Sequence, residues 1–298
     1  MRLDRLRIFH VAAQKMSFTA AAEALHLTQP GVTKHIQELE RQYGQPLFDR
    51  LGKSVALTQA GQILWQASAD VFRRLEEAKA RIDDLGQARG GQLRVGASNS
   101  IGTGLLPHLL ARFASTHPGV ELATDIGLSG DIENRLLDHA LDVGLLGHAP
   151  SFPALEATAF AYDRLVLVVP PGHQWADRTS PVAVAELANE VFLMSRPGSG
   201  TRRLIEALLV EAGVTLRRKQ VMGSTEGVKR SVEAGLGISL LSHCVVQKEV
   251  AAGWLSVVPT IGLPTERTYY LAHHRDRYLP AAARAFRQLL LAEGNSSD

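Results

Sequence analysis

The chain has 298 residues, of which 45% are hydrophobic and 21% charged, and its formal net charge is +2. This composition excludes an extended disordered chain or a fibrous coiled coil and supplies enough apolar material for a globular core. No apolar run approaches the ~18 residues of a membrane span, and residues 1–30 contain no apolar signal-peptide core, so we expect a cytoplasmic protein without a membrane partner. Cys244 is the single cysteine, which excludes an internal disulfide.

Positive charge is concentrated near the N-terminus. Residues 1–60 carry eight Lys and Arg against five Asp and Glu, whereas residues 91–298 carry 19 against 20. Clustered Lys and Arg neutralise phosphates, so this excess is a mild indication of nucleic-acid binding.

Three short helices are predicted in the first 45 residues or so. Apolar residues at helical spacing between Leu3 and Ala13 indicate the first, and the alanine-rich segment 20–25 indicates the second, capped by Ser17 or Thr19. Thr28 is a suitable N-cap for the third, with a proline in its first turn. Two short helices joined by a tight turn form a helix-turn-helix, whose second helix enters the major groove of double-stranded DNA.

The polar face of the third helix carries side chains suited to base edges. Gln pairs with adenine, Lys donates to guanine, and Thr offers a hydroxyl and a methyl group. The residues on this face are Gln29, Thr33, Lys34 and Gln37. A solvated surface helix would show the same pattern, and the pattern alone leaves both interpretations open.

A β-hairpin is predicted after the third helix. Short apolar stretches at residues 46–50 and 55–57 flank Gly52-Lys53-Ser54, which has the composition of a turn. Such a hairpin, or wing, would place Arg50 and Lys53 near its tip, where they suit phosphate or minor-groove contacts. They could equally be ordinary charges at a hairpin tip.

Residues 58–88 are predicted to form one long helix. Apolar residues recur in a strict four-three pattern, with Ser68 as the polar exception, at positions 64, 68, 71, 75, 78, 82 and 85. This spacing is typical of a coiled-coil seam and favours a dimer over packing of the helix on its own domain.

From Gly90 onward, short apolar strands alternate with amphipathic helices, which indicates an α/β domain with a parallel sheet. The strands expected span residues 93–97, 120–126, 141–146, 165–169, 191–194 and 267–272. A helix is expected to run from Ser98–Ser100 through Phe113, and a closing helix over 278–291. Several helices begin with Ser or Thr, and a helix N-terminus with free N–H groups suits a small anion. Each of these hydroxyls could instead be only an N-cap.

Five segments resemble the LysR-type bacterial transcriptional regulators: 18–22 (FTAAA), 27–36 (LTQPGVTKHI), 39–40 (LE), 46–50 (PLFDR) and 57–61 (LTQAG). The resemblance is dense over residues 1–65 and weaker to about residue 292. It implies an α/β-plus-α protein with a winged helix-turn-helix domain at 1–58 and a dimerising linker helix and hinge at 59–89. The remainder, 90–298, would be a two-lobed effector domain built like a periplasmic binding protein. Lobe I would hold about 90–162 and 268–298, and lobe II about 163–267.

The resemblance also assigns roles to particular positions. It places Gln29, Pro30, Thr33 and Lys34 in the groove and Lys53 on the wing, although Gly31 and Thr33-Lys34 depart from the alanine and Ser-Arg that are commoner in the family. The effector would lie between the lobes against Ser98, Ser100, Ser129, Gly147, Ser199, Gly200, Thr201 and Thr225. Segments 98–104 and 196–202 look most like the branch that governs carbon fixation or sulfur assimilation, which implies an oxyanion, carboxylate or phosphorylated metabolite.

The mechanism expected is effector-induced closure of the lobes, which changes tetramer geometry, DNA bending and recruitment of RNA polymerase. Alternatives are a solute-binding or enzymatic α/β domain with an appended DNA-binding module. No nucleophile-elbow, zinc-protease, P-loop or dinucleotide motif occurs, so no catalytic residue and no cofactor is expected. His243-Cys244 are sequence neighbours that rarely align as base and nucleophile, and His273-His274 have no third metal ligand at useful spacing.

Overall fold

The computed structural model describes residues 2–51, 54–85, 90–263 and 265–294. The chain divides into two compact units, Met1–Ile82 and Asp83–Asp298. The boundary predicted at residue 58 falls inside the first unit, so the finer division into a DNA-binding domain and a linker helix stays a prediction. None of the helices in the described ranges is both long and apolar enough to cross a membrane.

The first unit opens with the three predicted short helices: α1 (Leu3–Lys15), α2 (Phe18–Ala24) and α3 (Gln29–Tyr43). Ser17 caps α2 by accepting the N–H of Ala20, and Thr28 caps α3 by accepting the N–H of Gly31. Both caps satisfy helix-start donors that would otherwise lack partners. The three helices share one buried core, to which α3 contributes Val32 and Ile36.

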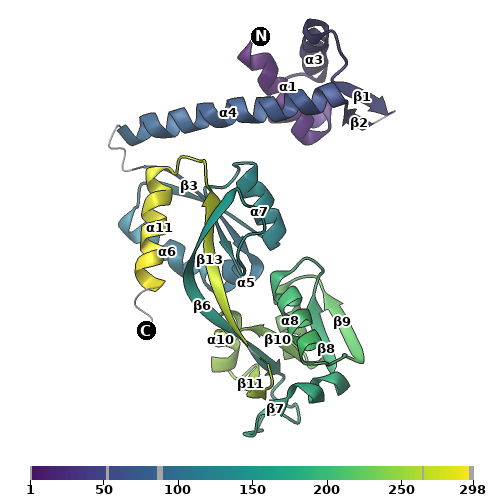
Figure 1. The fold of residues 1–298 in the computed structure, drawn as a ribbon, viewed down its shortest axis with the longest axis vertical. Coiled ribbons are helices and arrows are strands. Elements are labelled where there is room, and N and C mark those ends of the chain that lie inside the picture. The colour runs from purple at the N-terminus through teal and green to yellow at the C-terminus, as the bar shows by residue number, and fades with distance from the viewer. Residues whose placement is uncertain (1, 52–53, 86–89, 264, 295–298) are drawn as a thin grey trace. The chain divides into compact units, whose positions relative to one another are not determined.

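The predicted wing is present as an antiparallel pair, β1 (Phe48–Leu51) and β2 (Ser54–Leu57) (Figure 1). The helix that follows, α4 (Gln59–Leu85), is capped by Thr58, whose hydroxyl accepts the N–H of Gly61 at 3.0 Å. A Cβ at Gly61 would lie 2.0 Å from the backbone oxygen of Leu47, so only glycine allows α4 to approach the wing this closely.

The predicted coiled-coil seam along α4 divides into two parts. Near its start, Leu64 packs against the core of the helix-turn-helix and Ser68 is fully buried. Further along, Val71, Leu75 and Ile82 are exposed, Ile82 to 65%. The first part therefore packs on its own domain, and the second part leaves an uncovered apolar row.

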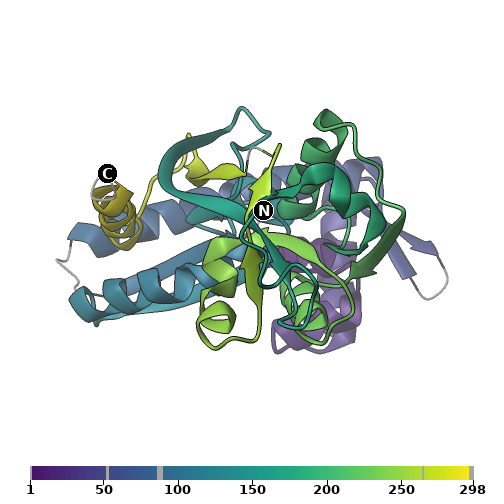
Figure 2. The same ribbon diagram turned by 90° about the horizontal axis from the view of Figure 1, so that it is seen from below.

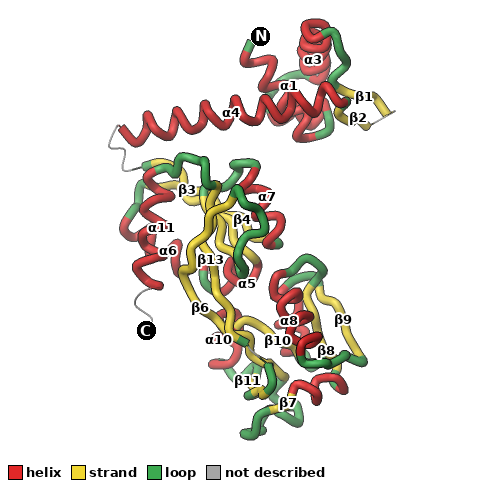
Figure 3. Tube along the Cα trace, viewed as in Figure 1, coloured by secondary structure: helices red, strands yellow, loops and turns green. Residues whose placement is uncertain are grey.

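The second unit is an α/β fold (Figures 1 and 3). It contains more than one buried core. Its strands are β3 (Gly91–Ser98), β4 (Val120–Gly127), β5 (Val143–Leu146), β6 (Leu155–Val169), β7 (Val182–Ala183), β8 (Val191–Ser195), β9 (Arg218–Met222), β10 (Ser239–Ser242), β11 (Ser256–Val258), β12 (Thr260–Ile261) and β13 (Glu266–His274). Its helices are α5 (Asn99–Gly104), α6 (Leu106–Thr116), α7 (Ser129–Leu137), the 3₁₀ helix Val184–Asn189, α8 (Gly200–Glu211), α9 (Thr225–Glu233), α10 (His243–Ala251) and α11 (Ala281–Gly294).

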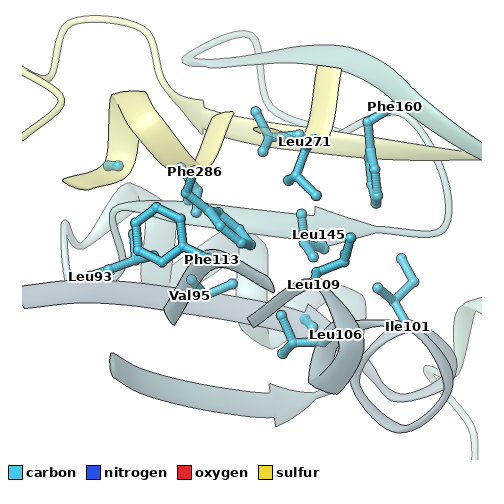
Figure 4. Packing of buried hydrophobic residues seen from close by; sticks show 14 of the residues in the cluster. Leu93, Val95, Ile101, Leu106, Leu109, Phe113, Leu145, Phe160, Leu271 and Phe286 are labelled. Atoms are coloured by element: carbon cyan, nitrogen blue, oxygen red, sulfur yellow. The ribbon is translucent and has the colours of Figure 1, made fainter. Parts of the chain in front are cut away.

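We keep the name lobe I for the part around the core of β3, β5, α6 and α11, and lobe II for the part around the core of β8, β10 and α8. In lobe I, Phe113 of α6 meets Phe286 of α11 edge to face, with ring centroids 5.4 Å apart (Figure 4). In lobe II, Phe192 and Met194 of β8 are fully buried.

Two long strands join the lobes, and they correct the expectation of a parallel sheet. β3 pairs in parallel with β4 and β5, but β13 runs antiparallel to both β5 and β6, so the sheet is mixed. β6 and β13 lie side by side in both views (Figures 1 and 2). β6 begins at Leu155, ten residues before the predicted start. The prediction missed the lobe I half of this strand because that half alternates polar and small residues and lacks the apolar run of the lobe II half.

The helix predicted from Ser98–Ser100 through Phe113 is wrong as a single element. It ends at Gly104, and a new helix begins at Leu106 with Pro107 in its first turn. Proline lacks the N–H that a continuous helix would need at that position, but it fits a first turn, where no such bond is made.

Candidate effector site and nucleic-acid interface

The polar face of α3 is presented to solvent. Gln29, Pro30, Lys34 and Gln37 are exposed, and Thr33 is half-buried. The side-chain amide of Gln29 donates to the hydroxyl of Thr33 at 3.0 Å. The predicted base-reading residues therefore share one accessible helix face, opposite the face that enters the core.

On the wing, Arg50 lies in β1 and its backbone pairs with Val55 of β2. The Arg50 side chain and Lys53 lie outside the described residues. Their predicted contacts with phosphate or the minor groove stay predictions.

In the second unit, a small cavity lies where the two lobes meet. Its lining comes from the ends of β3 and β4, the starts of α5, α7 and α8, and β13. The residues are Ser98, Asn99, Ser100, Gly127, Leu128, Ser129, Ser199, Gly200, Thr201 and Arg267. The cavity volume is about 10 Å³, room for a single water molecule.

Ser98 occupies the N-cap position of α5 and Ser129 the first position of α7, but neither side chain makes a capping hydrogen bond. The hydroxyls of Ser98 and Ser129 are buried and have no hydrogen-bond partner. Ser199, by contrast, caps α8 by accepting the N–H of Arg202 at 3.4 Å. A buried hydroxyl without a partner loses the hydrogen bonds that it makes with water, so Ser98 and Ser129 are poised to bind a group that enters the cavity.

Arg267 is the one charged residue among those that line the cavity, and sequence reasoning missed it. The side chain is only 7% exposed, and its Nη1 donates to the hydroxyls of Thr201 at 3.2 Å and Ser242 at 2.9 Å. Its Nε has no partner. A buried guanidinium that contacts hydroxyls and keeps a free donor is suited to an anion.

Contacts across the cavity join the lobes directly. The hydroxyls of Ser100 in lobe I and Thr201 in lobe II are 3.1 Å apart, and Arg267 donates to Thr201 from β13. The two lobes are therefore in direct contact at the cavity.

Behind Arg267, a chain of hydroxyls leads to a carboxylate. The Tyr269 hydroxyl donates to Asp163 at 2.5 Å and lies 3.2 Å from the Ser242 hydroxyl, which Arg267 contacts. Burial raises the pKa of the Tyr269 phenol, which keeps it protonated. Burial, followed by the negative charge of Asp163, also raises the pKa of the Cys244 thiol to about 12, so this cysteine is not a reactive thiolate.

Six of the eight predicted effector residues line the cavity, and two do not. Gly147 instead makes room for the arginine, because a Cβ there would lie 2.2 Å from Arg267 Nη2. Thr225 is buried at the start of α9, where Ser224 provides the cap. The local sequence carries no signal that singles out Arg267, because β13 also contains Glu266, Thr268 and two histidines.

A helix-turn-helix unit with a wing, followed by a two-lobed α/β domain with a polar cavity, defines a DNA-binding regulator with an effector-binding domain. Two family models match: the bacterial regulatory helix-turn-helix protein of the lysR family over residues 3–62, and the LysR substrate binding domain over residues 86–295. The chain belongs to the LysR family of transcriptional regulators.

Known relatives agree with this assignment over nearly the whole chain. The RuBisCO operon transcriptional regulator of Allochromatium vinosum is 35% identical, covering 98% of this chain and 96% of that protein. Its name agrees with the carbon-fixation side of the predicted branch.

Solved structures share the fold. Full-length CbnR in complex with its target DNA has a TM-score of 0.70 at 22% identity and covers 98% of this chain and 100% of that one. The CcmR regulatory domain of Synechocystis, in complex with 2-PG, has a TM-score of 0.63 at 26% identity and covers 70% of this chain and 99% of that one.

Proposed function

We propose that the effector of this regulator is a small anion held at the lobe interface by Arg267 and the hydroxyls of Ser98 and Ser129. The observation that carries the proposal is the group of three buried polar atoms without partners, Ser98 Oγ, Ser129 Oγ and Arg267 Nε, around one cavity. An anion would accept from all three, and it would also face the first N–H groups of α7 and α8.

Ser100, Ser199, Gly200 and Thr201 complete the proposed site. An oxyanion, carboxylate or phosphorylated metabolite satisfies these donors, and the 2-PG bound by the CcmR regulatory domain makes 2-PG a first compound to test. The hydroxyls of Ser100 and Thr201 are hydrogen-bonded to each other. Binding of the effector would replace this hydrogen bond with hydrogen bonds to the effector.

For the DNA-binding half, we propose that Gln29, Pro30, Thr33, Lys34 and Gln37 contact bases, with Arg50 and Lys53 on the backbone or minor groove. Residues 1–58 would be the DNA-binding domain, and 59–89 the linker through which two chains pair. Pairs of dimers would form a tetramer in the cytoplasm and recruit RNA polymerase. The names of the relatives make a carbon-fixation operon the first target to examine.

The effector proposal is tested by titration calorimetry of the full chain with sulfate, phosphate and 2-PG. Ser98→Ala and Ser129→Ala should each weaken binding by about 1.5–3 kcal/mol, the range for hydrogen bonds to charged groups. Neither should lower the thermal stability of the free protein, because each removes a hydroxyl that has no partner.

Ser239→Ala is the matched control. Ser239 is as buried as Ser129, but its hydroxyl donates to the backbone oxygen of Leu193 at 2.8 Å within lobe II. This variant should lose stability and keep its anion affinity. Unchanged affinity in both Ser98→Ala and Ser129→Ala would contradict the proposed site.

A further inference from the structure

The starts of α7 in lobe I and α8 in lobe II face each other across the cleft. A Cβ at Gly200 would lie 3.3 Å from the Ser129 hydroxyl. One turn further along each helix are Glu133 on α7 and Arg203 on α8. His148, in the loop that follows β5, contacts both, so a polar cluster joins the lobes beside the effector site.

Neutral His148 is hydrogen-bonded to Arg203 of lobe II. Its Nδ1 lies 2.7 Å from the backbone oxygen of Ala149, which only accepts, so Nδ1 carries the proton. Its Nε2 lies 2.6 Å from Nη2 of Arg203, which only donates, so Nε2 offers a lone pair. Both contacts require the same neutral tautomer.

Protonation of His148 removes its hydrogen bond with Arg203. A proton on Nε2 would face the N–H of Arg203 at 2.6 Å, and two cations would meet without an acceptor between them. The nearby acceptor is Oε1 of Glu133, at 3.6 Å within lobe I. Glu133 is buried, and its other oxygen is held by the N–H of Ser151 at 2.9 Å.

The charged groups around His148 come from three elements. Glu133 faces it from α7, while Arg203 and the positive N-terminal end of α8 face it from lobe II, where a Cβ at Gly200 would lie 3.7 Å from the imidazole. From β13, Arg267 abuts Gly147, the residue before His148. A protonated His148 therefore turns away from three positive groups toward one carboxylate.

We propose that the His148–Arg203 bond is a clasp that holds the lobes closed only while His148 is neutral, so that protonation opens the cleft and weakens effector binding. The clasp itself follows from the contacts between the lobes. Its effect on binding rests on the proposed anion site.

The clasp is tested by measuring the distance between the lobes without a ligand. Spin labels on His108→Cys in α6 and Val210→Cys in α8 report opening, since both positions are exposed. Cys244 resists labelling because it is half-buried and its thiol has a raised pKa. Labelled chain is diluted with unlabelled chain so that each distance lies within one protomer.

Lowering the pH from about 8 to about 5.5, the range in which an imidazole titrates, should lengthen this distance in the wild type. His148→Gln should keep the short distance at both values, because its amide oxygen accepts from Arg203 and does not titrate. Arg203→Gln should give the long distance throughout. An unchanged wild-type distance, or an equal change in His148→Gln, would overturn the clasp.

A second measurement follows sulfate affinity, since sulfate keeps its charge over this range. Wild-type affinity should fall as the pH is lowered from about 8 to about 5.5, whereas that of His148→Gln stays level. A pH-independent wild-type affinity would also overturn the proposal. Absence of sulfate binding at every pH would count against the anion site, and the distance measurement would still decide the clasp.

Discussion

The Oε1 atom of Glu40, near the end of α3, accepts the backbone N–H of Leu47 at 2.9 Å and that of Phe48 at 3.4 Å. One carboxylate thereby ties the helix that carries the predicted base-reading residues to the first strand of the wing. The two predicted DNA-contacting elements are held in a fixed relation by this contact.

Glu40→Ala should destabilise the first unit by about 1–3 kcal/mol, because it leaves two N–H groups without their acceptor. Operator affinity should fall as well, since the wing loses its anchor on α3. Chemical denaturation and operator titration measure the two effects. Glu40→Gln keeps an acceptor oxygen and should recover most of both losses, so equal damage from the two substitutions would contradict this role.

Lys34→Ala should weaken binding to the operator by about 1–3 kcal/mol and affect random DNA much less, as expected for a base contact. Lys53→Ala should weaken binding to the operator and to random DNA alike. It should also reduce the slope of log affinity against log salt concentration by about one, as expected for a phosphate contact. Fluorescence anisotropy at several salt concentrations separates the two. Equal losses on both DNAs for Lys34→Ala would make Lys34 a phosphate contact.

Leu75→Lys should dissociate the dimer that we propose to form through α4, because a charge would enter an apolar seam. Leu75 is 46% exposed in the single chain, so the substitution should cost the monomer little stability. Sedimentation velocity gives the assembly state. Ile63→Lys is the control, since Ile63 is 64% exposed on the same helix and lies off the seam. If both substitutions dissociated the dimer equally, the proposal that the dimer forms through the seam containing Leu75 would be wrong.

Gly147→Ala should lower anion affinity, because its methyl group would meet Arg267 Nη2 and displace the guanidinium. Gly130→Ala on α7 is the matched control, since no atom lies within 4 Å of the Cβ that it would add. Calorimetry with sulfate should show weaker binding in the first variant and wild-type binding in the second. A wild-type value for Gly147→Ala would mean that Arg267 does not need its present position.

His10 should make the stability of the first unit depend on pH. Burial lowers the pKa of His10 below its ordinary value of 6.5, so the unfolded chain binds the proton more readily than the folded chain. Stability is therefore complete above about pH 6.5 and falls as the pH is lowered toward the folded pKa. Thermal unfolding between about pH 8 and pH 5.5 measures this loss.

His10→Asn should flatten that dependence. Its amide can replace the His10 Nδ1 that lies 2.8 Å from the Ser68 hydroxyl, and it does not titrate. Ser68 donates to the backbone oxygen of Trp65 and is therefore available as an acceptor. A pH dependence as steep as that of the wild type would assign the titration to another group.

Local patterns were enough to predict the DNA-binding half. The spacing of Val32, Ile36 and Leu39 defined which face of α3 is buried, and Thr28 defined where the helix starts. These features depend on neighbours within one or two helical turns, so they can be recognised in the sequence. The same holds for the hairpin, whose two strands are adjacent in the chain.

The effector half depended on contacts between distant segments. Ser98, Ser129 and Ser199 look alike as hydroxyls at helix starts, yet Ser199 is a cap and the other two have buried hydroxyls without partners. Arg267 enters the cavity because β13 crosses between the lobes and Gly147 leaves room for its guanidinium. The sequence by itself determined the family and the elements of the DNA-binding half, because periodicity and caps are local. Only the tertiary structure decided which polar atoms are buried without a hydrogen-bond partner, because that depends on how distant strands and helices pack.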